Sequence, residues 1–258
     1  MITKGHFLLM EVGEFKSWLA NQKITRKITR LQVHHTWKPN YTTRINQDPF
    51  TCLEGMRRDH LAKGWNGTGQ NITIFEDGKI AISLDRDLNQ TPAGISGANT
   101  GALCIENIGN FDKGGDTMTV AQIHAITHVY ACLLDKLNLP ADTEHIVYHA
   151  WYSPTGAFLG DYVPGRSSKT CPGTNFWGDG NTKVAANKGF IPAVKEELDR
   201  LKGVEPDLET AKVYVNGEKI EDGFILEGRV YVPLRAACEA LGAKVGWDNK
   251  TKTAELTK

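Results

Sequence analysis

A mostly apolar run, residues 102–108, lies near the middle of the 258-residue chain. Such a run predicts a buried strand. Glu106 interrupts it, and burying an ionisable side chain is costly unless the group is paired, hydrogen-bonded or functional. The run therefore predicts a core strand and makes Glu106 a candidate functional residue.

The segments around this strand show the periodicities of helices and of further strands. Apolar side chains recur at helical spacing in several segments, and Pro192 should kink the last of them. Thr119 is the expected N-cap of the clearest helix. Helices are predicted over residues 11–24, 49–64, 119–137 and 182–202, and strands over residues 29–36, 71–75, 79–83 and 102–108.

The composition changes after residue 202. Residues 203–210 carry Gly and Pro among charged residues, which is typical of a linker. Two hairpin patterns, a short helix beginning at Pro233 and two closing strands follow. We therefore predict two domains, residues 1–202 and 211–258, joined by a linker over residues 203–210.

Charge and hydropathy exclude several classes of partner. The chain has 30 Lys and Arg residues and 30 Asp and Glu residues, so long-range electrostatics gives no reason to expect nucleic acid or an anionic membrane surface. No apolar run approaches the roughly 18–20 residues that cross a bilayer. The first eleven residues lack the pattern of a secretory signal. We expect synthesis in the cytoplasm without a signal peptide and no membrane insertion; the oligomeric state is left open.

The histidines and cysteines suggest a metal site. Five cysteines at wide spacings do not form a disulfide framework, but Cys171 and His149 bracket a loop rich in Gly, Pro and Ser. A catalytic zinc takes about three N or S ligands and leaves one position open. A histidine at the end of strand 29–36 could be the third. Because neighbouring side chains on a strand face opposite ways, only His34 or His35 can take part, and the residues alone do not decide which.

Two other interpretations use the same residue types. His124 and His128 lie one helical turn apart, but the zinc-protease helix has Glu after its first histidine, and here an alanine follows. Alternatively, Cys171 is a nucleophile with His149 as its base. That arrangement leaves Glu106 and the strand-borne histidines without a role.

Four motifs, taken in chain order, resemble those of the zinc-dependent N-acetylmuramoyl-L-alanine amidases of the phage lysozyme and peptidoglycan-recognition type. The resemblance covers roughly residues 28–178 and is strongest toward the endolysins of phages and prophages of Gram-positive, spore-forming bacteria. The motifs are Val33-His34-His35-Thr36, Cys104-Ile105-Glu106, His149 and Lys169-Thr170-Cys171-Pro172-Gly173, with Trp65 and the hairpin turn at Asp77-Gly78 fitting as well.

This resemblance implies a fold and a cofactor. The fold is α/β, with a central mixed β-sheet flanked by helices. The cofactor is Zn²⁺, held by the first histidine of the pair, His34, together with His149 and Cys171. His35 would then face away from the ion. The loop of residues 153–168, longer than in compact members of the family, is expected to rim the groove.

The resemblance also implies roles in catalysis and substrate binding. Glu106 matches the catalytic glutamate that orients or deprotonates the attacking water, and Lys169 matches a position that helps to stabilise the oxyanion. Many members have a tyrosine where this chain has Gln70, so its hydrogen bond would be absent or would come from Gln70 or Lys169. The expected substrate-binding residues are Trp65, Gln70 and Trp151.

The second domain resembles the small α+β domain named after the N-terminal region of copper amine oxidases. Residues 232–235, 241–243 and 245–248 carry this resemblance. The segment contains no histidine, so copper is not expected. We expect it to target the enzyme to the cell wall; the alternative is a module for stability or oligomerisation.

Together these features predict a peptidoglycan hydrolase that cleaves the amide bond between N-acetylmuramic acid and L-alanine with zinc-activated water. Bacterial peptidoglycan is then the partner, reached at the cell wall after release from the cytoplasm. Two alternatives are a non-catalytic peptidoglycan-binding module, whose relatives typically lack the cysteine ligand, and a peptidase that uses Cys171 and His149.

Overall fold

The computed structural model describes residues 1–204, 209–226 and 228–258. The chain forms two compact units, one ending at Val204 and the other containing the described residues from Glu209 onward. Within the predicted linker, residues 205–208 lie outside the described residues, as does residue 227 in the second predicted hairpin. No helix among the described residues is long and apolar enough to span a membrane.

The first unit is built on a seven-stranded sheet with the order β1-β2-β5-β4-β6-β3-β7. Strands β4, β6, β3 and β7 are parallel to one another, and the strands from β1 through β2 and β5 to β4 pair in antiparallel fashion. The predicted mixed sheet is thus confirmed. The strands are β1 (Ile2–Lys4), β2 (Phe7–Met10), β3 (Arg30–His35), β4 (Ile72–Ile74), β5 (Ile80–Ser83), β6 (Ala102–Asn107) and β7 (Ile146–Tyr148).

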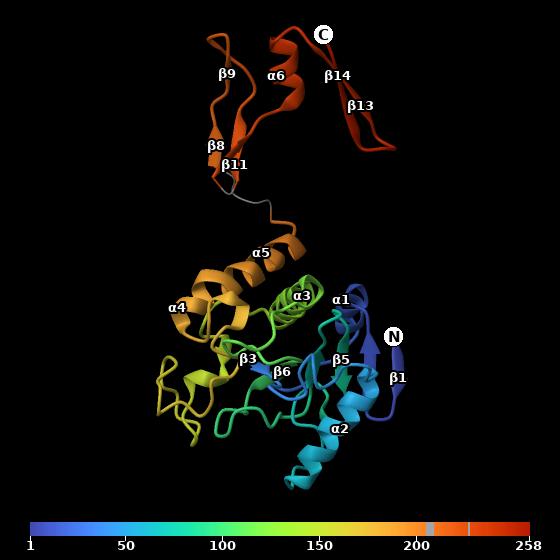
Figure 1. The fold of residues 1–258 in the computed structure, drawn as a ribbon, viewed down its shortest axis with the longest axis vertical. Coiled ribbons are helices and arrows are strands. Elements are labelled where there is room, and N and C mark those ends of the chain that lie inside the picture. The colour runs from blue at the N-terminus through green and yellow to red at the C-terminus, as the bar shows by residue number, and fades with distance from the viewer. Residues whose placement is uncertain (205–208, 227) are drawn as a thin grey trace. The chain divides into compact units, whose positions relative to one another are not determined.

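Helices cover both faces of this sheet (Figure 1). One apolar cluster joins one face to α1, α3 and α5, and a smaller cluster joins the other face to α2. Because side chains alternate along a strand, Leu31 and Val33 of β3 enter the first cluster, and Gln32 and His34 face the α2 side. The helices are α1 (Val12–Ala20), α2 (Pro49–Ala62), α3 (Val120–Leu137), α4 (Lys183–Ala185) and α5 (Ile191–Leu201).

The helix ends follow local chemistry. Thr119 caps α3 as predicted, its Oγ1 accepting the backbone N–H of Gln122 at 3.0 Å. Asn138 ends the helix with a left-handed backbone (φ 52°). The predicted last helix is divided: a π-helical stretch, Ala186–Phe190, precedes α5, which carries Pro192 in its first turn. The chain is already helical before this proline, so its missing N–H removes one hydrogen bond of the helix.

The second unit is small and mostly exposed. Its described residues form three small sheets, β12-β11-β8, β10-β9 and β13-β14, and one helix. Among its residues with described burial, only Gly223 is buried, so this part of the chain has little core of its own. The elements are β8 (Glu209–Ala211), β9 (Tyr214–Val215), β10 (Glu218–Lys219), β11 (Gly223–Leu226), β12 (Arg229–Tyr231), α6 (Leu234–Ala240), β13 (Lys244–Asp248) and β14 (Thr253–Thr257).

Candidate active site

Three candidate residues lie at the carboxyl ends of neighbouring parallel strands. His34 is the next-to-last residue of β3, and Glu106 lies beside it in register on β6. His149 directly follows β7, the other neighbour of β3. Backbone pairing, rather than side-chain contact, therefore brings two histidines and a carboxylate to one edge of the sheet. This edge is the usual ligand-binding edge of parallel sheets.

His34, His149 and Cys171 form a compact donor set. The Nδ1 atoms of the two histidines are 3.2 Å apart, and the Sγ of Cys171 is 3.6 Å from Nδ1 of His34. The donor atoms all lie within 4.8 Å of one another, and all three side chains are buried. Two imidazoles and a thiol are a donor set that suits zinc.

The loop that carries Cys171 is tied to the ends of β3 and β7. The backbone N–H of His35 points at the Sγ of Cys171 at 3.3 Å, and the N–H of Ala150 donates to the Cys171 carbonyl at 2.7 Å. The side-chain amide of Asn181 donates to the carbonyl of Thr170 at 2.7 Å. Backbone groups at the end of β3 and just after β7 thus fix the position of the Cys171 thiol.

The structure brings His34, and not His35, to the donor set. His35 points to the opposite side of β3, where its Nδ1 accepts the backbone N–H of Phe111 at 3.1 Å. Its ring lies beside the Phe111 ring, with centroids 6.2 Å apart. The ambiguity left by the alternation of side chains is thereby removed.

Burial keeps the donor groups uncharged in the metal-free chain. It lowers the pKa of His149 to about 3, with help from the positive charge of Lys169. Burial, followed by the neighbouring His149, holds the pKa of His34 well below its ordinary value. Burial also raises the pKa of the Cys171 thiol well above its usual range. Neutral imidazoles have free lone pairs, and the thiol would lose its proton when a metal binds.

Glu106 supplies a carboxyl group to the lining of a groove that also contains the donor set. Burial raises its pKa to about 7, and the charge of Lys169 opposes that rise. A carboxyl that titrates near neutrality can take up and return a proton under ordinary conditions. Lys169 is exposed and lines the same groove.

The groove has a volume of about 840 Å³, and its lining includes Trp65 and Gln70. Trp65 stacks on His60, with ring centroids 4.7 Å apart, and stays 37% exposed. Gln70 is buried, and its Nε2 donates to Oγ1 of Thr73 at 2.9 Å. Its Oε1 has no protein partner. A buried acceptor without a partner is unusual, and the residue that carries it lines the groove.

The structure does not bring Trp151 into this groove. The side chain is fully buried, its ring stacks on Tyr148 with centroids 4.7 Å apart, and its Nε1–H donates to the Asn181 carbonyl at 2.8 Å. Residues 153–168 do not contribute to the described lining either. That loop packs elsewhere, with Gly156 against the backbone of residues 96–97.

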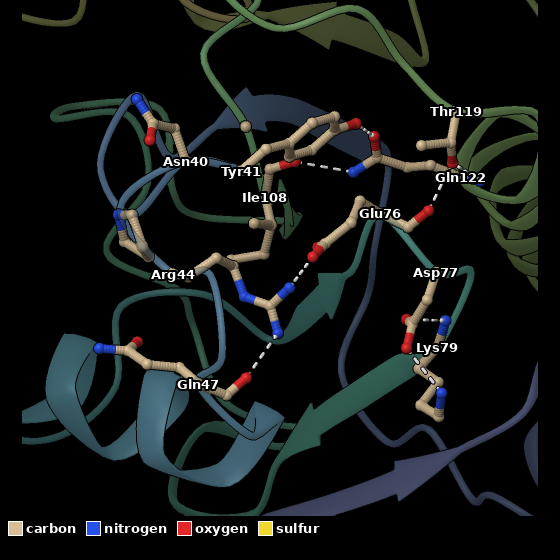
Figure 2. Close-up of polar contacts among 12 residues, drawn as sticks. Asn40, Tyr41, Arg44, Gln47, Glu76, Asp77, Lys79, Ile108, Thr119 and Gln122 are labelled. Carbon is tan, nitrogen blue, oxygen red and sulfur yellow. Dashed lines mark hydrogen bonds and ion pairs between the residues drawn. The ribbon is translucent and has the colours of Figure 1, made fainter.

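A buried polar network holds the loop between β3 and α2, which forms one wall of the groove (Figure 2). Arg44 of this loop pairs with Glu76 in the turn between β4 and β5. Tyr41 donates to the side-chain oxygen of Gln122 on α3, and Gln122 donates to the carbonyl of Ile108 at 2.8 Å. The turn between β4 and β5 and the helix α3 therefore both hold this wall of the groove in place.

Of the two histidines on α3, His128 is engaged in other contacts and His124 is exposed. Nδ1 of His128 is 2.7 Å from a carboxylate oxygen of Glu197 on α5, and its Nε2 is 3.4 Å from the Sγ of Cys132. The potential metal-binding groups among the described residues do not include His124 or His128.

Three residues beside His34 were given no role in the sequence analysis: Gln32, Gly94 and Cys104. Gln32 lies two residues before His34 and so shares its face of β3, a signal that strand alternation contains. Cys104 pairs in register with Gln32, and it forms a second potential metal-binding group with His34 and Glu106. Gly94 comes from a distant loop, and no local pattern indicates its position.

A buried set of two nitrogens and one sulfur, beside a carboxyl group in an open groove, is the arrangement of a metal-dependent hydrolase. The chain belongs to the N-acetylmuramoyl-L-alanine amidase family, whose model matches residues 24–174. The predicted enzyme class, a peptidoglycan-hydrolysing amidase, is thereby confirmed. Residues 208–258 match the copper amine oxidase N-terminal domain, in agreement with the second predicted resemblance.

Several solved structures are similar to this chain. The endolysin and N-acetylmuramoyl-L-alanine amidase LysCS from Clostridium intestinale is 21% identical, with 70% of this chain and 86% of that chain covered and a TM-score of 0.43. The endolysin of the Thermus scotoductus bacteriophage Ph2119 is 19% identical, with 68% of this chain and 96% of that chain covered and a TM-score of 0.40. Drosophila PGRP-LB is 19% identical, with 59% of this chain and 78% of that chain covered and a TM-score of 0.44. No curated protein sequence matches the chain.

Proposed function

We propose that this amidase is a zinc enzyme that hydrolyses the bond between N-acetylmuramic acid and L-alanine, with His34, His149 and Cys171 as the metal ligands. The proposal rests on the convergence of these three buried donor groups from separate segments. When bound, the ion supplies a Lewis acid and lowers the pKa of a coordinated water. Three protein ligands leave a position open for chemistry, as in other catalytic zinc sites.

The proposed roles of the other residues follow from their charge and position. Glu106, with its pKa of about 7, takes the proton from the attacking water and returns it to the leaving amine. Lys169, exposed at the groove, stabilises the negative charge on the carbonyl oxygen. Trp65, which is partly exposed, offers a flat apolar face to the substrate, and Gln70, the other proposed substrate-binding residue in the groove, lines the same surface.

The peptidase alternative conflicts with the electrostatics of its two residues. A cysteine nucleophile reacts as the thiolate, which a nearby base or cation must favour. Here burial raises the pKa of the Cys171 thiol and lowers that of His149 to about 3. A histidine with so low a pKa is a weak base for a thiol that holds its proton tightly.

Mass spectrometry of digested cell walls tests the reaction. Wild-type enzyme should release stem peptides with new L-alanine amino termini. Chelation of the metal, and the His34→Ala variant, should both stop the release, while the exposed His124→Ala serves as a matched control. New reducing sugars or other peptide ends would contradict the assigned bond, and undiminished activity after chelation would contradict the metal.

We also propose a role for residues 211–258 in binding the wall, because they form a separate unit that exposes many apolar side chains. The enzyme would act on the wall after release from the cytoplasm. Wall pull-down of the full chain against a Trp247→Ala variant tests this role, since Trp247 is 56% exposed. Equal binding of the two proteins would speak against it.

A further inference from the structure

Gln32 is a buried polar side chain next to the proposed metal site, with no role in the chemistry described so far. It is fully buried and precedes His34 by two residues on β3, so both side chains point to the same face of the sheet. Burying an amide is costly unless its polar atoms are paired. The partners of Gln32 therefore indicate what it does.

The partners fix which way the amide group points. Its Nε2 lies 3.0 Å from the carbonyl oxygen of Ala98 and 3.5 Å from Oδ1 of Asn99. A carbonyl oxygen only accepts, so the NH₂ end of the amide must face it. The Oε1 of Gln32 consequently faces the other way, 3.3 Å from Nε2 of His34.

The orientation of the amide selects one tautomer of His34. Oε1 can only accept, so Nε2 of the imidazole must carry the hydrogen. The lone pair of His34 is then on Nδ1, the atom that lies 3.2 Å from His149 and 3.6 Å from Cys171. We propose that Gln32 is a positioning residue that holds the His34 ring in the tautomer and orientation that bind the metal.

Gly94 leaves room for this contact. A Cβ at residue 94 would lie 2.2 Å from Oε1 of Gln32 and 3.0 Å from Nε2 of His34. The side chain of Asn99 fixes the glycine in place by accepting the N–H groups of Gly94 and Ile95, each at 2.9 Å. The same loop supplies the Ala98 carbonyl, so one short segment orients Gln32 and encloses it.

This inference rests on the proposed ligand set, and zinc affinity tests it directly. Zinc would be titrated into the metal-free full chain in competition with a chromophoric chelator. Gln32→Leu should weaken binding about 10- to 100-fold, as the loss of a histidine's partner does in other zinc sites. Gln32→Glu keeps an acceptor facing His34 but loses the donor to Ala98, and its affinity should stay within a few-fold of wild type. The exposed Gln90→Leu is the control.

The two substitutions separate positioning from a structural role. If Gln32 only anchored the loop at Ala98, Gln32→Glu would bind zinc as weakly as Gln32→Leu, and the proposal would be overturned. It would equally be overturned if Gln32→Leu bound zinc like wild type. A wild-type chain that binds no zinc would instead refute the ligand set itself.

NMR gives a readout that does not depend on metal. In the metal-free wild-type chain, the ¹⁵N shifts of His34 should show the tautomer with its hydrogen on Nε2, and Gln32→Leu should give a mixture. Gly94→Ala, which displaces Oε1 by contact, should move the shifts in the same direction. Unchanged tautomer populations in both variants would refute the positioning role.

Discussion

Replacing Glu106 with glutamine should change how the stability of the metal-free chain depends on pH. The folded chain holds this carboxyl at a pKa of about 7, against an ordinary value of 4.5. Between these pH values the folded state binds more protons than the unfolded state. The free energy of unfolding therefore falls as pH rises from about 4.5 to about 7. Glutamine does not titrate, so Glu106→Gln lacks this loss.

The size of the effect follows from the shift. At about 1.4 kcal/mol per pH unit, the full difference in pKa corresponds to at most about 3 kcal/mol. The carboxyl is half-buried, with part of its surface open to the groove, and solvent screening reduces the figure. We expect about 1–2 kcal/mol.

Urea unfolding in the presence of a chelator, at several pH values from 4.5 to 8, measures this difference. The histidines of the site act in the opposite direction: the pKa of His149 is lowered to about 3, so its contribution rises with pH through the ordinary histidine range. Both proteins contain these histidines, and subtraction removes their effect. As pH rises to 8, the free energy of unfolding of Glu106→Gln should increase by about 1–2 kcal/mol relative to that of wild type. If the difference in free energy of unfolding between the two proteins stayed constant, or if Glu106→Gln became less stable relative to wild type as pH rises, the raised pKa of Glu106 would be refuted.

Three further predictions concern other parts of the first unit. Thr119→Ala removes the N-cap of α3 and should lower the free energy of unfolding by about 1 kcal/mol in urea, whereas Thr119→Ser should not. Arg44→Met leaves Glu76 without its partner and should cost about 1–3 kcal/mol; an additional Glu76→Gln change should recover part of that loss, and no recovery would mean that the pair contributes little. Adding zinc at 100 times its Kd should stabilise the wild-type chain by about 2.7 kcal/mol in thermal unfolding, and Cys171→Ser should show a much smaller shift.

Elements with a strong period and a cap could be predicted from the sequence. The apolar side of α3 and its cap Thr119 are encoded within one segment, and the same holds for the buried run of β6. The edge hairpin β1-β2 was missed because it is stabilised by antiparallel pairing with β5, a partner about seventy residues away. Short edge strands show little of their own pattern.

The site shows the same division between local and distant information. That only one of His34 and His35 can face the donor groups follows from strand alternation, but the choice between them depends on β7 and on the loop carrying Cys171. From the sequence, Trp151, an aromatic side chain two residues after His149, could either line the groove or lie in the core. In the structure it packs against Tyr148 and lies in the core. No local sequence pattern indicates the role of Gly94, because that role depends on its closeness to Gln32 and His34 in the folded chain.

The two adjacent histidines at the end of β3 have a consequence for folding. A parallel pair that slipped by one residue would exchange the faces of the strand, placing His35 beside Glu106 and His34 among the apolar side chains under α3. A slipped chain could still form many backbone hydrogen bonds, and the His35 imidazole would face His149 and Cys171, but Val33 would then stand where Gln32 does and could accept no hydrogen bond from that imidazole. The hydrogen-bond partner of the imidazole in the proposed metal site, and with it the tautomer of that imidazole, therefore depends on the correct register of β3 with β6.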